Sequence, residues 1–136
     1  KSKEAVQLFD YIHSVDSMKL ASELSKAEAK LSVKRKYFIQ VNVGMEEQKS
    51  GVTKKEIGNL LKCCVSEKNL NIIGLMCIPP FDQNPTPHFN YLKELNNDLG
   101  LKFISMGMSE DYMNAAKCGS THVRIGSKIF GSRSNQ

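Results

Sequence analysis

The sequence of 136 residues has no tryptophan, only four cysteines, and no run of apolar residues long enough to form a membrane span. A membrane-spanning helix needs about 20 predominantly apolar residues, so no membrane partner is expected. Cys63 and Cys64 are adjacent, and Cys77 lies within an apolar run. Neither arrangement has the spacing of a disulfide framework or a zinc site. We therefore expect reduced thiols, no metal and a cytoplasmic protein.

Arginine is scarce as well, at three residues against sixteen lysines, although the net charge is +5. A basic excess of this kind can favour nucleic acid or other anionic partners. The lysines are scattered through segments with a helical pattern, and the aromatic residues are not interleaved with them as a base-stacking platform requires. We interpret the lysines as solvated helix faces and expect no nucleic-acid partner.

Strand-like and helix-like patterns alternate along the chain. Segments rich in β-branched and aromatic residues predict strands, and the segments between them carry apolar stripes at helical spacing. The expected strands are 11–15, 37–43, 71–78, 103–106 and 122–125. Because strictly alternating β and α units with short connections form a parallel sheet with helices outside it, the sequence predicts an α/β fold.

Two parallel architectures fit this alternation, an open doubly wound sheet and a barrel. A doubly wound nucleotide-binding domain usually has a glycine-rich phosphate loop after its first strand, and this sequence lacks one there. Its Gly-Ser signals follow the last two strands, where barrels often bind phosphate, and a complete barrel has eight strands in about 250 residues. Residues 1–136 are therefore predicted to form a single domain, a partial TIM barrel of about five parallel strands that lacks the first strands.

Polar residues occur on the predicted strands at positions that face the barrel interior. Side chains alternate between the two faces of a strand, and the Ile and Val positions of the second strand suit the helix side. Gln40 and Asn42 are therefore expected inside. In the last strand, Val123 is assigned to the helix side and His122 and Arg124 to the interior. A buried guanidinium needs a partner or a ligand, so Arg124 suggests a site, with a purely structural polar cluster as the alternative.

Glycine and serine open a helix after each of the last two predicted strands. Ser109 follows Gly107 by two positions, and Gly126 is followed directly by Ser127. Glycine lets backbone N–H groups approach an anion, and the start of a helix supplies unpaired donors. Side by side, the two segments predict a phosphate cup. Arg124 lies too far back to be the main phosphate ligand and is expected to meet a ring or an acceptor attached to that phosphate.

Seven short segments together resemble the pyridoxal 5′-phosphate (PLP) homeostasis family, whose members have a barrel like that of alanine racemase. The resemblance covers essentially the whole chain. It rests on these segments, in this order: Ser14–Asp16, Gln40–Asn42, Glu46–Gly51, Gly74–Met76, Gly107–Ser109, Val123–Gly126 and Ile129–Gly131. The resemblance implies a cytosolic protein that binds PLP, takes part in vitamin B6 homeostasis and has no established catalytic turnover.

The resemblance also implies roles for individual residues. It places Ser109, Gly126 and Ser127 on the PLP phosphate, Arg124 at the pyridine nitrogen, and Asn42 and Met76 around the ring. A guanidinium stays protonated and only donates hydrogen bonds, so it keeps the pyridine nitrogen unprotonated. An acidic partner would instead hold a pyridinium and strengthen the electron sink. The arginine therefore suits a cofactor that is held more than one that drives broad carbanion chemistry.

The lysine that forms the Schiff base in this family is expected upstream, on the first barrel strand, and is absent from this chain. The chain is thus expected to be the C-terminal portion of the barrel. Lys128 follows the Gly-Ser pair and is predicted to point outward from its helix. Because a sheet with an open edge tends to pair with other chains, self-association through that edge is also expected.

Two other functions remain open at this point. One is a PLP-dependent enzyme of the amino-acid racemase type, which needs a second acid–base residue. His13 and His122 are candidates, although a lone strand histidine is more often structural. The other is a barrel enzyme that binds a phosphorylated small substrate in the same cup without PLP. Such an enzyme needs a carboxylate or a lysine at the strand ends.

Overall fold

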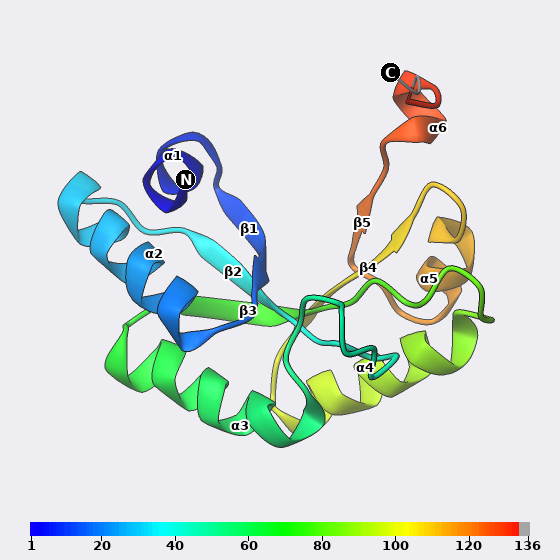
Figure 1. Ribbon diagram of the computed structural model, residues 1–136, viewed down its shortest axis with the longest axis horizontal. Coiled ribbons are helices and arrows are strands. Elements are labelled where there is room, and N and C mark those ends of the chain that lie inside the picture. Colours follow the sequence, from blue (N-terminus) through cyan, green and yellow to red (C-terminus); the bar gives the residue numbers. More distant parts are fainter. Residues whose placement is uncertain (134–136) are drawn as a thin grey trace.

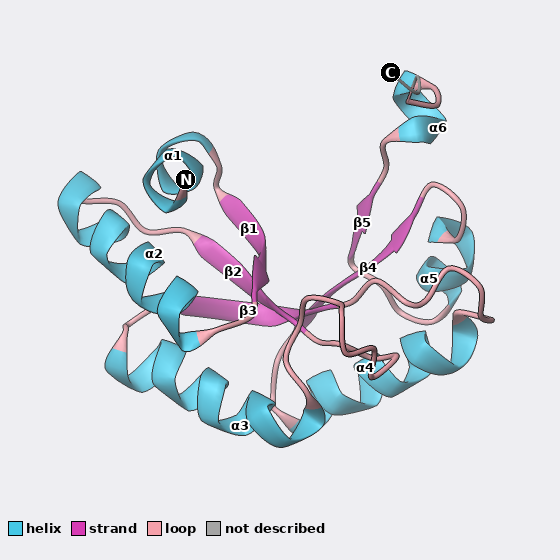
Figure 2. Cartoon of the chain, in the orientation of Figure 1, coloured by secondary structure: helices cyan, strands magenta, loops and turns pink. Residues whose placement is uncertain are grey.

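Five parallel strands follow one another in the sheet in the same order as in the chain. The computed structural model describes residues 1–133 and is shown in Figure 1, with its helices and strands distinguished in Figure 2. The strands are β1 (Tyr11–Val15), β2 (Lys36–Gln40), β3 (Asn71–Met76), β4 (Phe103–Met108) and β5 (His122–Arg124). Consecutive parallel strands joined by helices are the repeating unit of a (β/α) barrel. The predicted partial barrel of five parallel strands is confirmed.

The helices α2 to α5 lie along the outer side of this sheet (Figure 1). The helices are α1 (Ser2–Leu8), α2 (Met18–Leu31), α3 (Lys54–Lys62), α4 (Thr86–Asp98), α5 (Tyr112–Lys117) and α6 (Ser127–Phe130), and a π-helical turn, η1 (Cys63–Glu67), extends α3. None of the helices in the described part of the chain is long and apolar enough to span a membrane. The sequence pattern did not predict α1 or η1.

Helix α2 shows how the sequence determines one of these elements. The Ser17 hydroxyl accepts a hydrogen bond from the Leu20 N–H at 3.1 Å and so caps the first turn. Leu24 and Ala27 lie one turn apart and are buried against the sheet. The helix ends at Ser32, whose φ of 54° lies in the left-handed region. The sequence offers Asp16 or Ser17 as the cap, and the structure shows that it is Ser17; the predicted apolar stripe is confirmed.

The hydrophobic core lies between the sheet and the outer helices. Ile39 and Val41 from the β2 segment are buried there, as the alternation of side chains predicted. Val123 faces the helix side as predicted, with its Cγ1 near Gly107 beside α5, but it is 42% exposed. It belongs to an edge strand of three residues, beside the short helix α5, so its outer face is only partly covered.

Side chains from opposite edges of the sheet meet on its inner side. The ring of Tyr11 on β1 lies 5.6 Å from the ring of His122 on β5. Four strand intervals separate these two strands, and in a flat sheet that spacing would be about 19 Å. The sheet must therefore curl around its interior. The inward orientation predicted for His122 is confirmed, since its ring also contacts Phe38 at 5.2 Å and Phe103 at 5.8 Å.

The chain leaves β2 earlier than the sequence pattern suggested. The strand ends at Gln40, and Val41 forms only an isolated bridge with Val52. Asn42 therefore lies in the loop between β2 and α3, where the alternation rule for strands does not apply. Its side chain is oriented by contacts within that loop.

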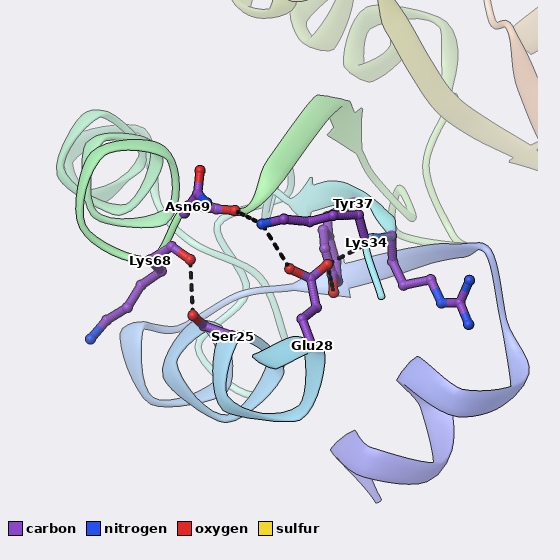
Figure 3. A network of polar contacts seen from close by, with 7 residues as sticks. Ser25, Glu28, Lys34, Tyr37, Lys68 and Asn69 are labelled. Carbon is purple, nitrogen blue, oxygen red and sulfur yellow. Dashed lines mark hydrogen bonds and ion pairs between the residues drawn. The ribbon is translucent and has the colours of Figure 1, made fainter. Parts of the chain in front are cut away.

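A network of polar contacts joins α2 to β2 at the end of the sheet where the strands begin (Figure 3). Glu28 on α2 is only 4% exposed, and its carboxylate accepts from the Tyr37 hydroxyl at 2.8 Å and from the Arg35 backbone N–H at 2.8 Å. The Lys34 ammonium lies 3.4 Å from the second carboxylate oxygen. A buried carboxylate is tolerated only when it has such partners, so this network is part of the fold and lies away from the strand ends that carry the cup.

Candidate cofactor site

A cavity of about 1290 Å³ lies beyond the carboxyl ends of β3, β4 and β5. Its wall includes residues 77–81, 107–114 and 126–128, which come from the end of β4, the loops after the three strands and the first turns of α5 and α6. In barrels this end of the strands is the functional face. The cavity therefore lies where the Gly-Ser segments predicted a ligand.

The structure brings the two predicted Gly-Ser segments together. The Ser109 hydroxyl oxygen accepts from the Gly126 N–H at 3.3 Å and from the Lys128 N–H at 3.1 Å. Ser127 lies between these two donors in the chain, and all four residues line the cavity. Two backbone donors that converge on one oxygen are arranged as donors to an oxyanion must be.

Arg124 connects the ends of β5 and β3. Its Nη2 donates to the carbonyl oxygen of Cys77 at 2.8 Å. Its Nε is buried and has no acceptor among the described residues. Burial lowers the pKa of the guanidinium from its ordinary value. A buried donor without a partner is costly, and an acceptor atom on a ligand would satisfy it.

Two glycines of the cavity wall serve different purposes. Gly107 has φ +103°, and a Cβ there would lie 2.7 Å from the Cβ of Ala115, so both the backbone conformation and the packing require glycine. Gly126 is different, because a Cβ there would meet nothing within 4 Å. Packing does not demand a glycine at position 126, and its missing side chain leaves room for a ligand beside the convergent donors.

Of the predicted site residues, Ser109, Gly126 and Ser127 line the cavity, whereas Arg124, Met76 and Asn42 do not. Met76 is 4% exposed and lies outside the core that the helices share with the sheet. The Asn42 side chain is engaged in its own loop, since Nδ2 donates to the Glu46 carbonyl at 2.6 Å and Oδ1 accepts from the Glu46 N–H at 3.1 Å. The structure therefore does not bring these two residues to Ser109 and Gly126, and their contact with the ring stays a prediction.

Lys128 is exposed, as the prediction of an outward side chain implies, but it also borders the site. It is part of the cavity wall, and its Nζ lies 5.9 Å from the centre of the Tyr112 ring. Helix α6 has only four residues, and Lys128 is the second of them, so its side chain leaves the first turn beside the cavity. The sequence held no signal for this orientation.

Two titratable groups near Arg124, the Cys77 thiol and the His13 ring, have pKa values shifted toward their neutral forms. Burial raises the pKa of the Cys77 thiol to about 12, so it is no thiolate nucleophile. Burial, with smaller contributions from Arg124 and His122, lowers the pKa of His13 to about 4. Asp111 is occupied as well, because its carboxylate accepts from the Met108 N–H at 2.7 Å. The site is thus better equipped to hold an anion and a ring than to transfer protons.

Comparison with known proteins identifies the family of the chain. The sequence profile of the family described as alanine racemase, N-terminal domain, matches residues 1–134. The chain belongs to this family. Among its relatives is the pyridoxal phosphate homeostasis protein of Aquifex aeolicus, 40% identical over 131 residues, which cover 90% of this chain and 58% of the relative. The protein of the same name from Pseudomonas aeruginosa is 38% identical over 138 residues, which cover 98% of this chain and 60% of the relative.

Solved structures of the alanine racemase N-terminal domain type superpose well on the chain. PipY of Synechococcus elongatus, in a structure with PLP bound, has 30% sequence identity and a TM-score of 0.87, covering 96% of this chain and 65% of that one. Alanine racemase from Corynebacterium glutamicum has 17% identity and a TM-score of 0.65, covering 90% of this chain and 35% of that one, and it supports the fold alone. The chain spans less than two thirds of the length of the homeostasis proteins named above.

Proposed function

We propose that this chain holds the phosphate and the pyridine nitrogen of PLP and acts in intracellular PLP homeostasis without catalytic turnover. The observation that carries the proposal is the buried Nε of Arg124, which has no partner among residues 1–133 and lies close along the chain to the donors that converge on Ser109. The relatives named as pyridoxal phosphate homeostasis proteins and the PLP-bound structure of PipY support the choice of ligand.

The donor set fits PLP from one end to the other. The Ser109 hydroxyl would donate to the phosphate. The N–H groups of Gly126 and Lys128 donate to Ser109 in this structure, and they would reach a phosphate oxygen where it replaces that contact, with Ser127 between them in the same turn. Arg124 would donate to the pyridine nitrogen through Nε while Cys77 holds its Nη2. Bound PLP supplies an aldehyde and an aromatic ring that accepts electron density. Because a guanidinium donates and does not accept, Arg124 keeps the ring nitrogen unprotonated and moderates that electron demand.

The absence of turnover is part of the proposal. A PLP enzyme that moves protons at a substrate carbon needs a base with a suitable pKa close to it. Among the ionisable groups of the wall, the Cys77 thiol has a pKa raised by burial and the Asp111 carboxylate is bonded to a backbone N–H, while Glu110 and Lys128 also line the cavity. His13 is neutral at physiological pH and is bonded within the interior. Neither Cys77 nor His13 is suited to transfer protons at a substrate carbon, which supports a role in holding the cofactor.

The remaining expectations belong to the same proposal. The lysine that forms the Schiff base is expected upstream of this chain, which would be the C-terminal portion of a PLP-binding barrel. Four free cysteines, three of them buried, support a reducing compartment such as the cytoplasm. Strands β1 and β5 each have one unpaired edge among the described residues, which supports self-association through those edges.

The test is calorimetric titration of the purified chain with PLP and, separately, with pyridoxal, which lacks the phosphate. We expect PLP to bind and Ser109→Ala to weaken its binding by about tenfold, the effect of one lost hydrogen bond to a charged group. Ser66→Ala, an exposed serine on η1, is the matched control and should bind as the unmodified chain does. Circular dichroism checks that each variant is folded. Equal affinity for PLP and pyridoxal would exclude the phosphate cup and with it the proposed function.

A further inference from the structure

Lys128 has a position that the proposed function does not use. Of the residues that line the cavity in the described part of the chain, it is the one lysine. Its backbone N–H already points to the Ser109 hydroxyl at 3.1 Å, so it belongs to the group of donors that would bind a phosphate. Its ammonium lies 5.9 Å from the centre of the Tyr112 ring, within the range of a cation–π contact. Both ends of this residue therefore face the ligand space.

We propose that Lys128 is a covalent attachment site for phosphorylated aromatic aldehydes, the class of compound to which PLP belongs. The inference rests on the proposed function, because the phosphate cup is what brings the aldehyde to the amine. A ligand held by its phosphate at the Lys128 N–H is confined within reach of the same residue's side chain. Such confinement raises the effective concentration of the two reacting groups far above their concentration in solution.

The reaction is an imine condensation and needs no oxidant or reductant. The Lys128 ammonium first leaves the face of Tyr112 and gives one proton to solvent. The neutral amine then attacks the aldehyde carbon, a C–N bond forms, and the carbonyl electron pair moves to the oxygen, which takes up a proton. Loss of that oxygen as water, together with the remaining amine proton, leaves a C=N bond. Water reverses the reaction, so attachment at Lys128 would be reversible.

The surroundings of Lys128 distinguish it from an ordinary surface lysine. Lys128 is exposed, as are Lys117 on α5 and Lys102 before β4, but of these three lysines it alone lines the cavity. Free aldehyde reacts with such lysines according to their exposure alone. Attachment that is directed by the cup should instead depend on Ser109 and should be blocked by inorganic phosphate, which competes for the same donors.

The experiment uses PLP as the probe, in a buffer free of phosphate and amines. The chain is mixed with one equivalent of PLP and reduced with borohydride, and its peptides are analysed by mass spectrometry. We expect one reduced adduct, on Lys128, at a level on the order of tenfold above that of Lys117 or Lys102. Excess inorganic phosphate should suppress this adduct, whereas sodium chloride at equal ionic strength should leave most of it.

Three variants separate the covalent step from binding. Lys128→Met and Lys128→Arg should both lose the adduct, and the arginine keeps a positive charge beside Tyr112. Both keep the backbone N–H of residue 128, so we expect them to bind PLP without the covalent bond and more weakly than the unmodified chain does. Lys117→Met is the matched control and should keep the adduct on Lys128. Ser109→Ala should reduce the adduct without removing the amine.

Each contrary result has a distinct meaning. Phosphate-sensitive binding of PLP with no adduct on Lys128 would overturn the attachment site and leave the proposed function standing. Adducts spread over exposed lysines, unaffected by inorganic phosphate, would overturn it as well. If no binding of PLP is detected and no adduct forms, both this inference and the proposed function fail.

Discussion

The Nδ1 atom of His13 lies 2.7 Å from the hydroxyl oxygen of Ser105, although the two residues belong to β1 and β4. In a flat sheet, three strand intervals would separate them by about 14 Å. The hydrogen bond therefore crosses the concave interior of a curled sheet. The His13 ring also stacks on Phe38 of β2, with ring centroids 4.5 Å apart. One histidine thus connects three strands inside the barrel.

This position makes His13 a source of acid sensitivity. Its pKa is lowered from 6.5 to about 4, first by burial and then by Arg124 and His122. The unfolded chain takes up a proton at His13 more readily than the folded chain does, so stability is highest above pH 6.5 and declines as the pH falls toward 4. With allowance for the partial exposure of the ring, the loss is on the order of 2 kcal/mol.

Urea unfolding at pH 7 and at pH 4.5 measures this loss. We expect the free energy of unfolding to fall less between the two pH values in His13→Gln than in the unmodified chain. His88→Gln is the control, because His88 lies in the first turns of α4, outside the interior, and is bonded to Gln83 at 2.9 Å. An identical decline in His13→Gln and the unmodified chain would show that the interior histidine does not carry the effect.

The Glu28 network predicts a second stability effect (Figure 3). Glu28→Ala leaves the Tyr37 hydroxyl and the Arg35 N–H without their acceptor inside the protein. The expected loss in the free energy of unfolding is about 3 kcal/mol. Glu28→Gln keeps one acceptor oxygen and should lose less. The Lys34 side chain is 60% exposed, so Lys34→Met should cost under about 1 kcal/mol.

Chemical denaturation of the three variants at neutral pH measures these losses in the free energy of unfolding. Burial, and next the hydrogen bond to Glu28, raise the pKa of the Tyr37 hydroxyl, so Tyr37 remains a donor throughout the neutral range. The order Glu28→Ala, Glu28→Gln, Lys34→Met is therefore the expected order of decreasing loss. Equal losses in Glu28→Ala and Lys34→Met would mean that the surface ion pair, and not the buried bonds, provides the stability.

Local patterns were sufficient to predict most of the sheet. The alternation of β-branched and helical segments gave five parallel strands in chain order, and the Ser17 cap and the Leu24 stripe placed α2. Helix α1 has no comparable signal, because only Val6 among its residues is buried. It is held in place by a tertiary contact, in which Arg35 Nε donates to the Val6 carbonyl at 2.7 Å. No rule of sequence spacing predicts that contact.

The parts of the site that follow from the order of the strands in the sheet were predictable. The parts that depend on the conformation of a loop were not. Ser109 and Gly126 follow neighbouring parallel strands, so their proximity follows from the fold. Asn42 was expected inside because the second strand was extended past its true end at Gln40. The direction of Lys128 depends on the first turn of a helix of four residues, which no periodicity defines.

The two glycines of the cavity wall predict opposite outcomes when each is changed to alanine. Gly126→Ala places a methyl group in open space, so the free energy of unfolding should change by less than about 0.5 kcal/mol. The same methyl group occupies the ligand space and should weaken PLP binding. Gly107→Ala has a φ of +103° and a contact of 2.7 Å with Ala115, so it should lose at least 1 kcal/mol, as a rough minimum for strained backbone.

Thermal unfolding and calorimetric titration of both variants provide the measurements. The informative result is the contrast, in which Gly126→Ala keeps its stability and loses affinity while Gly107→Ala loses stability. A Gly126→Ala variant that binds PLP as well as the unmodified chain would show that the phosphate does not lie beside this residue.

Arg124 and Ser109 should affect different parts of the ligand. Among the described residues, Arg124 Nε is the buried donor without a partner. The Ser109 hydroxyl accepts hydrogen bonds from the backbone N–H groups of the cup. Arg124→Gln should therefore weaken binding of PLP by about tenfold, the effect of a lost charge-assisted hydrogen bond, and leave the affinity for inorganic phosphate nearly unchanged. Ser109→Ala should weaken the binding of PLP and of inorganic phosphate.

Arg124→Lys is expected to resemble Arg124→Gln, because an ammonium cannot bond the Cys77 carbonyl and a ring nitrogen with the fixed geometry of a guanidinium. Calorimetric titration of the three variants with each ligand makes the comparison. A parallel loss of phosphate affinity in Arg124→Gln would place the guanidinium at the phosphate instead of the ring.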